Sequence, residues 1–147
     1  NVAMIFRPLN YAVAFVGFTA LVALIAYLIE RYAGYSMSNG GTSVVVPLVC
    51  AMMEGQHYAR KAKAAPEKRA MWGAAARMTG TACMISVVIF GLLILVDPSL
   101  KGVFDILSVT AWMAICAMTL ALVLLVSRFG YGMGVRNQLK AQAHAGE

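Results

Sequence analysis

Charged side chains are scarce in this chain. Asp, Glu, Lys and Arg make up 12% of its 147 residues, whereas a soluble globular domain usually carries about 25%. So small a fraction excludes an ordinary soluble surface. The 61% of hydrophobic residues instead predicts that lipid surrounds most of the side chains, and a chain of this length is predicted to form a single domain, residues 1–147.

Residues that build catalytic and metal sites are also few. The three cysteines form no CxxC pair, so neither a disulfide framework nor a metal site is expected. Glu54 and His57 form one Glu-x-x-His pair, but a metal centre of that type needs a second pair facing it. No Gly-rich phosphate loop, carboxylate dyad or nucleophile–base pair is present. We therefore expect no enzyme activity, no catalytic residue, no metal and no cofactor.

Four apolar stretches are the main feature that is present. A membrane-crossing helix needs roughly 20 residues, and the predicted spans of this single transmembrane domain are 11–29, 38–58, 74–96 and 106–127. The second is the weakest, because Pro47 interrupts its backbone hydrogen bonding and Glu54 lies within it. A re-entrant or tilted interfacial segment is the alternative there. The predicted fold is an all-α integral membrane bundle of four transmembrane helices.

The ends of these stretches carry capping and turn signals. Asp97 followed by Pro98 predicts a capped, short surface helix, and Asp105 is a candidate cap for the fourth stretch. The glycines within residues 129–134 predict a bend away from a helix, since each costs about 1 kcal/mol relative to Ala. The polar tail, residues 135–147, is predicted to fray.

Basic residues are unevenly distributed along the chain. Of the 12 Lys and Arg residues, only Arg31 and Lys101 lie in the first and third connections. This asymmetry predicts that both termini and the second connection are cytoplasmic, and it accounts for the net charge of +6 without nucleic-acid binding. The bases of the second connection are expected to contact anionic phospholipid headgroups. They are Arg60, Lys61, Lys63, Lys68 and Arg69.

One acid and one base are expected at membrane depth. Glu54 is in the second stretch and Arg77 is near the start of the third. The short connection between the stretches predicts an antiparallel hairpin, in which an ion pair would reduce the desolvation cost of both groups. We interpret this pair as a structural clamp, with a proton or substrate path as the alternative. Tyr11, near the start of the first stretch, is expected at the headgroup level.

Small residues recur at four-residue spacing in the third stretch. Rows of this kind allow two helices to approach closely. The row would serve either packing within this bundle or docking of another membrane protein, and the pattern does not separate the two. The candidate helix-packing face consists of Ala75, Ala76, Thr79, Gly80 and Cys83.

Residues 53–60, followed by residues 66–69 and Trp72, resemble the central signature of a family of small bacterial inner-membrane proteins of unknown function. The resemblance implies a chain with four spans and a multi-pass location in the bacterial inner (plasma) membrane. It supplies no activity. Glu54 stands where small residues are common in that family.

The expected function is that of a non-catalytic accessory or assembly subunit of a larger bacterial membrane complex, with respiratory and photosynthetic complexes as candidates. The lack of a catalytic set, the small-residue faces and the minimal loops motivate this expectation. The partners would be other integral membrane proteins and anionic phospholipid. The alternative is a small transporter component that works through Glu54 and Arg77. An enzyme acting on lipid is a third interpretation, which lacks a nucleophile–base pair.

Overall fold

The computed structural model describes residues 6–35 and 42–146, and all the regular structure within them is helical. The predicted all-helical class is therefore confirmed, although the start of the predicted span 38–58 lies outside the described residues. In chain order the helices are α1 (Pro8–Ala33), α2 (Thr42–Ala62), α3 (Lys68–Val96), the 3-10 helix η1 (Pro98–Asp105) and α4 (Val109–Ala145). Among these described helices three, α1, α3 and α4, are long and apolar enough to cross a membrane.

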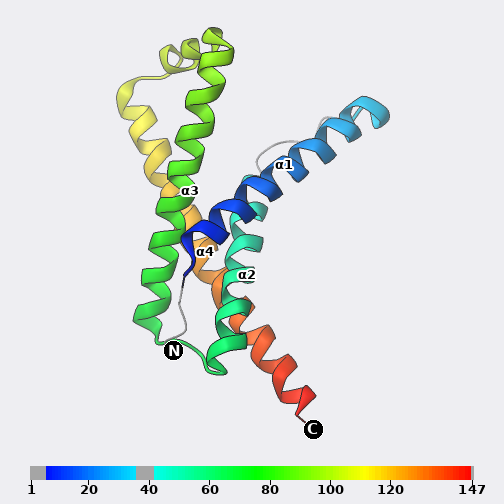
Figure 1. Ribbon diagram of the computed structural model, residues 1–147. Coiled ribbons are helices and arrows are strands. Elements are labelled where there is room, and N and C mark those ends of the chain that lie inside the picture. Colours follow the sequence, from blue (N-terminus) through cyan, green and yellow to red (C-terminus); the bar gives the residue numbers. More distant parts are fainter. Residues whose placement is uncertain (1–5, 36–41, 147) are drawn as a thin grey trace.

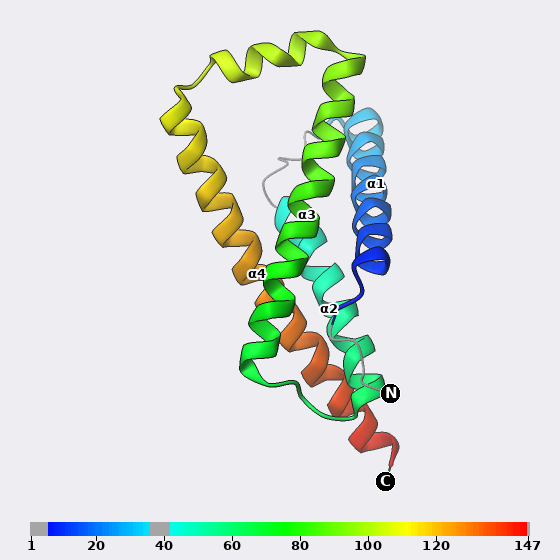
Figure 2. The same ribbon diagram turned by 60° about the vertical axis from the view of Figure 1, so that its left-hand side comes forward.

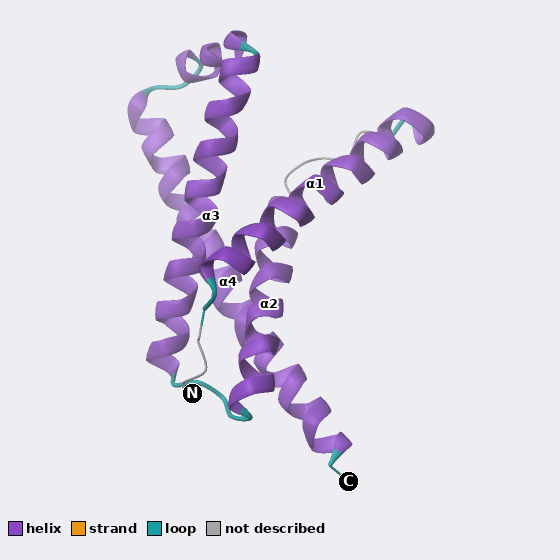
Figure 3. Ribbon diagram, in the orientation of Figure 1, coloured by secondary structure: helices purple, strands orange, loops and turns teal. Residues whose placement is uncertain are grey.

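The helices form a bundle that is tight at one end and open at the other. α2 and α4 run in the same direction and cross, so the α2–α3 connection and the end of α4 lie toward one end of the molecule (Figures 1 and 2). η1 joins α3 to α4 at the opposite end. α1 crosses its neighbours near its beginning and then diverges from them. Only short loops separate the helices from α2 onward (Figure 3).

Three glycines bring α2 and α4 into backbone contact. A Cβ atom added to Gly130 would lie 2.7 Å from a carbonyl oxygen of α2. One added to Gly134 would overlap the backbone of Met52, and one added to Gly55 would overlap that of Tyr131. Helices in lipid associate largely through such close packing, because lipid supplies no hydrophobic driving force between them.

The bend predicted at residues 129–134 is wrong, since α4 continues as a helix through the glycines. At Gly130 and Gly134 the intrinsic cost of about 1 kcal/mol each is offset by the close packing on α2 that only glycine permits. Residues 135–147, predicted to fray, also belong to α4 over most of their length. Val135 is buried, and Arg60 Nε donates a hydrogen bond of 3.2 Å to Gln138 Oε1, so the first part of this polar segment packs on α2.

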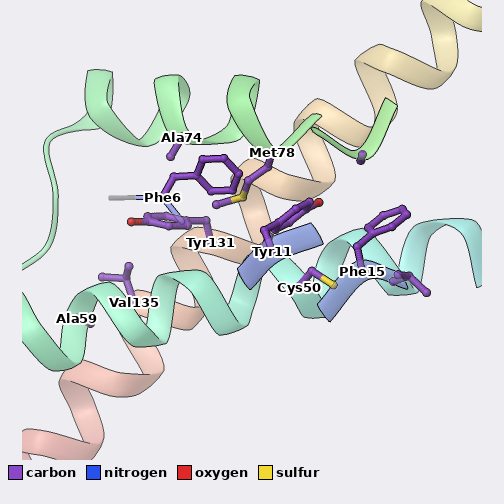
Figure 4. Packing of buried hydrophobic residues seen from close by; sticks show 12 residues of the cluster. Phe6, Tyr11, Phe15, Cys50, Ala59, Ala74, Met78, Tyr131 and Val135 are labelled. Carbon is purple, nitrogen blue, oxygen red and sulfur yellow. The ribbon is translucent and has the colours of Figure 1, made fainter. Parts of the chain in front are cut away.

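The core lies where the four long helices cross. Figure 4 shows side chains from all four meeting there, with Met78 of α3 close to Tyr131 of α4. By contrast, residues 16–35, 83–96 and 109–126 contain no buried side chain. The diverging halves of α1, α3 and α4 therefore have their side chains partly or fully exposed.

One predicted cap is confirmed and another is corrected. The Asp97 carboxylate accepts hydrogen bonds from the backbone N–H of Ser99 at 3.1 Å and from its hydroxyl at 2.6 Å, and it caps η1 as predicted. The cap of α4 is Ser108, whose hydroxyl accepts from the N–H of Ala111 at 3.3 Å. The predicted cap, Asp105, belongs to the last turn of η1 instead.

Replacing Gly134 with Ala should destabilise the protein by roughly 1–3 kcal/mol, the usual cost of overpacking, because backbone atoms of Met52 occupy the space. Thermal unfolding in detergent, followed by circular dichroism, would show a lower apparent Tm. Gly80→Ala is the matched control, since nothing lies within 4 Å of its added Cβ atom; better helix propensity should preserve or raise its Tm. Equal Tm values for the two variants would contradict the close contact.

Candidate functional site

A partly buried ion pair joins the residue that precedes α1 to the middle of α2. The side chain of Glu54 is 5% exposed and that of Arg7 is 28% exposed. Arg7 Nη2 donates to Glu54 Oε1 at 3.0 Å, while Arg7 Nε and the backbone N–H of Arg7 donate to Oε2 at 3.4 and 3.2 Å. Both carboxylate oxygens are thus occupied by donors of one residue.

This arrangement offsets a large desolvation cost. A charge removed from water costs several kcal/mol, which is recovered only when a partner is well placed and further hydrogen bonds satisfy the remaining atoms. Glu54 has both. Pro8, at the first position of α1, has no N–H to satisfy and sets the direction of the helix from that point. The ion pair therefore fixes where α1 leaves α2.

The structure corrects the predicted partner of Glu54, which is Arg7 and not Arg77. Successive residues of an α-helix are about 100° apart, and the buried face of α3 contains Ala75, Met78 and their neighbours. Arg77 lies off that face and is exposed. The short connection between α2 and α3 indicated that Glu54 and Arg77 lie at the same end of the two helices. It could not indicate whether Arg77 is on the face of α3 that turns toward Glu54.

Tyr11 belongs to the same buried cluster, whereas the sequence placed it at the headgroup level. It is 1% exposed, and its ring packs against Phe15 at 6.0 Å and edge-on against Phe6 at 5.5 Å. It also lies beside Cys50 and Ser127. Among the described residues, neither the Tyr11 hydroxyl nor the Ser127 hydroxyl has a well-formed hydrogen bond. α1 begins within the bundle rather than at its end, which is why Tyr11 is enclosed.

The chemistry of this cluster suits a clamp. The Glu54–Arg7 pair holds the start of α1 on α2, and Tyr11 of α1 lies beside Ser127 of α4. The carboxylate has donors from Arg7 on both oxygens. The predicted transporter alternative used Glu54 together with Arg77, and it loses that pairing in the structure. Among the described residues, no group of His, Cys, Asp or Glu could hold a metal ion.

A second polar contact joins α3 to α4. The guanidinium carbon of Arg128 lies 5.6 Å from the centre of the Trp72 ring, which is the geometry of a cation–π interaction. Arg128 closes the predicted fourth span, and its side chain is only partly exposed. The contact helps to hold α3 beside α4 at the tight end of the bundle.

The five bases predicted to meet lipid headgroups are exposed at this same end. Lys63 adopts the left-handed conformation with φ of 52°, and its N–H donates to the carbonyl oxygen of Ala59 at 2.9 Å, which ends α2. Arg60 is engaged by Gln138. Their contact with anionic phospholipid stays a prediction. The exposed set is Arg60, Lys61, Lys63, Lys68 and Arg69.

The predicted small-residue face of α3 is divided in two by the structure. Ala75 and Thr79 are buried within the chain's own bundle, while Ala76 and Gly80 are exposed. Cys83 is exposed and lines a cavity between the helices. The row therefore serves internal packing on one side and remains open on the other.

Sequence reasoning missed the residues that organise the site. Arg7 was counted only as a cytoplasmic charge, although a lone base directly before Pro8 could have been matched with the single acid of the second stretch. Gly130 and Gly134 have the spacing of a close helix contact but were interpreted as a bend. Gly55 was noted only as part of the family resemblance.

Comparisons with protein families, with curated proteins and with solved structures find no match to this chain. The function is therefore inferred from the chain's own residues. The resemblance of residues 53–60 and 66–69 to small bacterial inner-membrane proteins stays a prediction.

Replacing Arg7 with Met should lower the free energy of unfolding by about 2 kcal/mol or more, because Glu54 would be left buried without its partner. The partial exposure of Arg7 keeps this below the cost for a fully buried pair. Thermal or denaturant unfolding in detergent measures it. Arg77→Met is the matched control and should change stability by less than about 0.5 kcal/mol, as expected for an exposed side chain. If Arg77→Met lowered the free energy of unfolding more than Arg7→Met did, the result would support the predicted Glu54–Arg77 pair instead.

Proposed function

We propose that this chain is a non-catalytic accessory or assembly subunit of a larger complex in the bacterial inner membrane. The observation that carries the proposal is a face of small residues on α3 that its own bundle does not use. Gly73, Ala76 and Gly80 are exposed, and nothing lies within 4 Å of a Cβ atom added to Gly73 or Gly80. Their spacing of three and four residues places them on one side of the helix.

The chain itself demonstrates what such a surface does. α2 and α4 approach to backbone contact through Gly55, Gly130 and Gly134. Small residues on α3 would let a helix of another subunit approach in the same way, with van der Waals contact as the main source of affinity. Arg77 lies between Ala76 and Gly80 and is exposed. A partner helix with an acidic residue at that depth would neutralise it.

The proposed topology has four crossings with both termini in the cytoplasm. α2 lacks the apolar length of the other three helices, but its polar Glu54 is covered by neighbouring elements. α2 also runs alongside α4 in the same direction (Figure 1). This topology would put Arg31 and Lys101 outside and the other ten Lys and Arg residues inside, in accord with the positive-inside rule. The predicted respiratory or photosynthetic partner remains part of the proposal.

Labelling of single cysteines would test the topology, with Cys50, Cys83 and Cys116 first replaced by Ala. In spheroplasts an impermeant thiol reagent should label Tyr35→Cys and Ser99→Cys. Ala64→Cys and Ala145→Cys should react only after permeabilisation. Labelling of Tyr35→Cys and Ala64→Cys from the same side would mean that α2 does not cross.

Replacing Gly80 with Leu should detach the chain from its complex, because the branched side chain would hold the partner helix away from α3. The measurement is the set of proteins that co-purifies from native membranes in mild detergent. Gly17→Leu is the matched control, since Gly17 is also exposed and also has open space around it. Arg77→Met should weaken the association as well. Migration of the wild-type chain only as a small, single species would contradict the proposal.

A further inference from the structure

The diverging halves of the helices flank an apolar cavity that is open on one side. Its volume is about 540 Å³, and its walls come from α1, α3 and α4, with α2 contributing Val46 and Pro47. Its lining on α3 runs from Thr79 toward the η1 end of that helix, away from the basic connection between α2 and α3. We propose that this cavity binds one long hydrocarbon chain, from a membrane lipid or an isoprenoid.

The lining excludes a ligand that must be held by charge. All the described residues in the wall are uncharged. Two of its hydroxyl groups are already engaged, since Thr79 donates to the Ala75 carbonyl at 2.9 Å and Thr119 donates to the Ile115 carbonyl at 2.8 Å. Both threonines are bonded within their own helix, so most of the surface offered to a ligand is hydrocarbon. A cavity of this kind gives water too few hydrogen-bond partners to stay.

The dimensions of the cavity favour a hydrocarbon chain over a partner helix as its occupant. Along α3 the lining runs from Thr79 to Leu93, which is roughly 21 Å at 1.5 Å per residue. Dividing the 540 Å³ by this length gives a mean cross-section of roughly 26 Å² for the centre of a water-sized sphere, or roughly 57 Å² once the ~1.4 Å radius of that sphere is added. An α-helix 10 Å across needs ~80 Å². An extended hydrocarbon chain fits this mean cross-section, whereas a helix of a second copy or of another protein is wider than it.

The position of the cavity agrees with this occupant. Its wall on α1 extends from Phe15 to Ala26, where α1 diverges from α3 (Figure 1). If these helices cross the membrane, the cavity lies within the hydrocarbon layer, where a lipid tail can enter sideways. An empty space would leave the facing side chains without dispersion contacts. The inference depends on the membrane location but not on the proposed docking face of α3.

Native mass spectrometry of the full chain, purified in mild detergent, would test the inference. The wild type should retain one hydrocarbon-bearing molecule, and its mass would distinguish a phospholipid from an isoprenoid. Titration with dioleoyl phosphatidylglycerol should refill a delipidated sample. The double variant Ala23→Phe, Ser86→Phe fills the cavity and should weaken binding by roughly tenfold or more. The control Ala20→Phe, Val87→Phe alters neighbouring exposed residues outside the lining and should bind like the wild type.

Protection of a native cysteine gives a second measurement that needs no variant. Cys83 lines the cavity, whereas Cys116 is exposed elsewhere. Added phospholipid should slow the modification of Cys83 by a small apolar thiol reagent and leave Cys116 unchanged. The inference is overturned if the wild type retains no such molecule, if the control double variant loses it as readily as the cavity-filling one, or if both cysteines are protected equally. A failure of the Gly80→Leu experiment would leave these outcomes unaffected.

Discussion

Backbone contact between α2 and α4 at Gly55, Gly130 and Gly134 determines where the remaining parts of the bundle can lie. It brings Ser127 of α4 beside the face of α2 that holds Cys50 and Glu54. Tyr11 of α1 then fits against this surface. α3 packs on the same cluster through Met78 and its buried neighbours. A methyl group on any of the three glycines would hold α2 and α4 further apart, and α1 and α3 would then pack against a wider pair of helices.

The least apolar of the long helices is also the most enclosed. α2 contains the buried Glu54, whereas the apolar windows of α1, α3 and α4 are almost entirely unburied within the chain. This order is the reverse of a soluble protein, and it is what a hydrocarbon solvent requires. Polar groups are sheltered by protein, and the apolar helices face outward. A hydrocarbon solvent solvates the Glu54–Arg7 pair poorly, as water does Leu or Phe, so the protein covers the pair in its interior.

Composition and the length of the apolar stretches predicted the helical class and the approximate positions of α1, α3 and α4, because apolar runs of that length are visible directly in a sequence. Asp97 with Pro98 identified the start of η1 for a similarly local reason. The partner of Glu54 was predicted wrongly, since it depends on which helix face meets α2 across 47 residues, and the lone base before Pro8 was the one local signal for it. The glycines of α4 were misinterpreted because helix propensity is local, while their benefit comes from the backbone of another helix. The small residues of α3 were recognised, but their division between inner and outer sides needed the fold.

α1 is 26 residues long, or roughly 39 Å at 1.5 Å per residue, and it exceeds a hydrocarbon layer of ~30 Å. A helix with such an excess accommodates the mismatch by tilting. Because its buried residues, Tyr11 and Phe15, lie in its first turns, the beginning is fixed and the far end takes up the tilt. Bilayer thickness would thus set the angle between α1 and α3, and a thinner membrane would spread the two helices further apart.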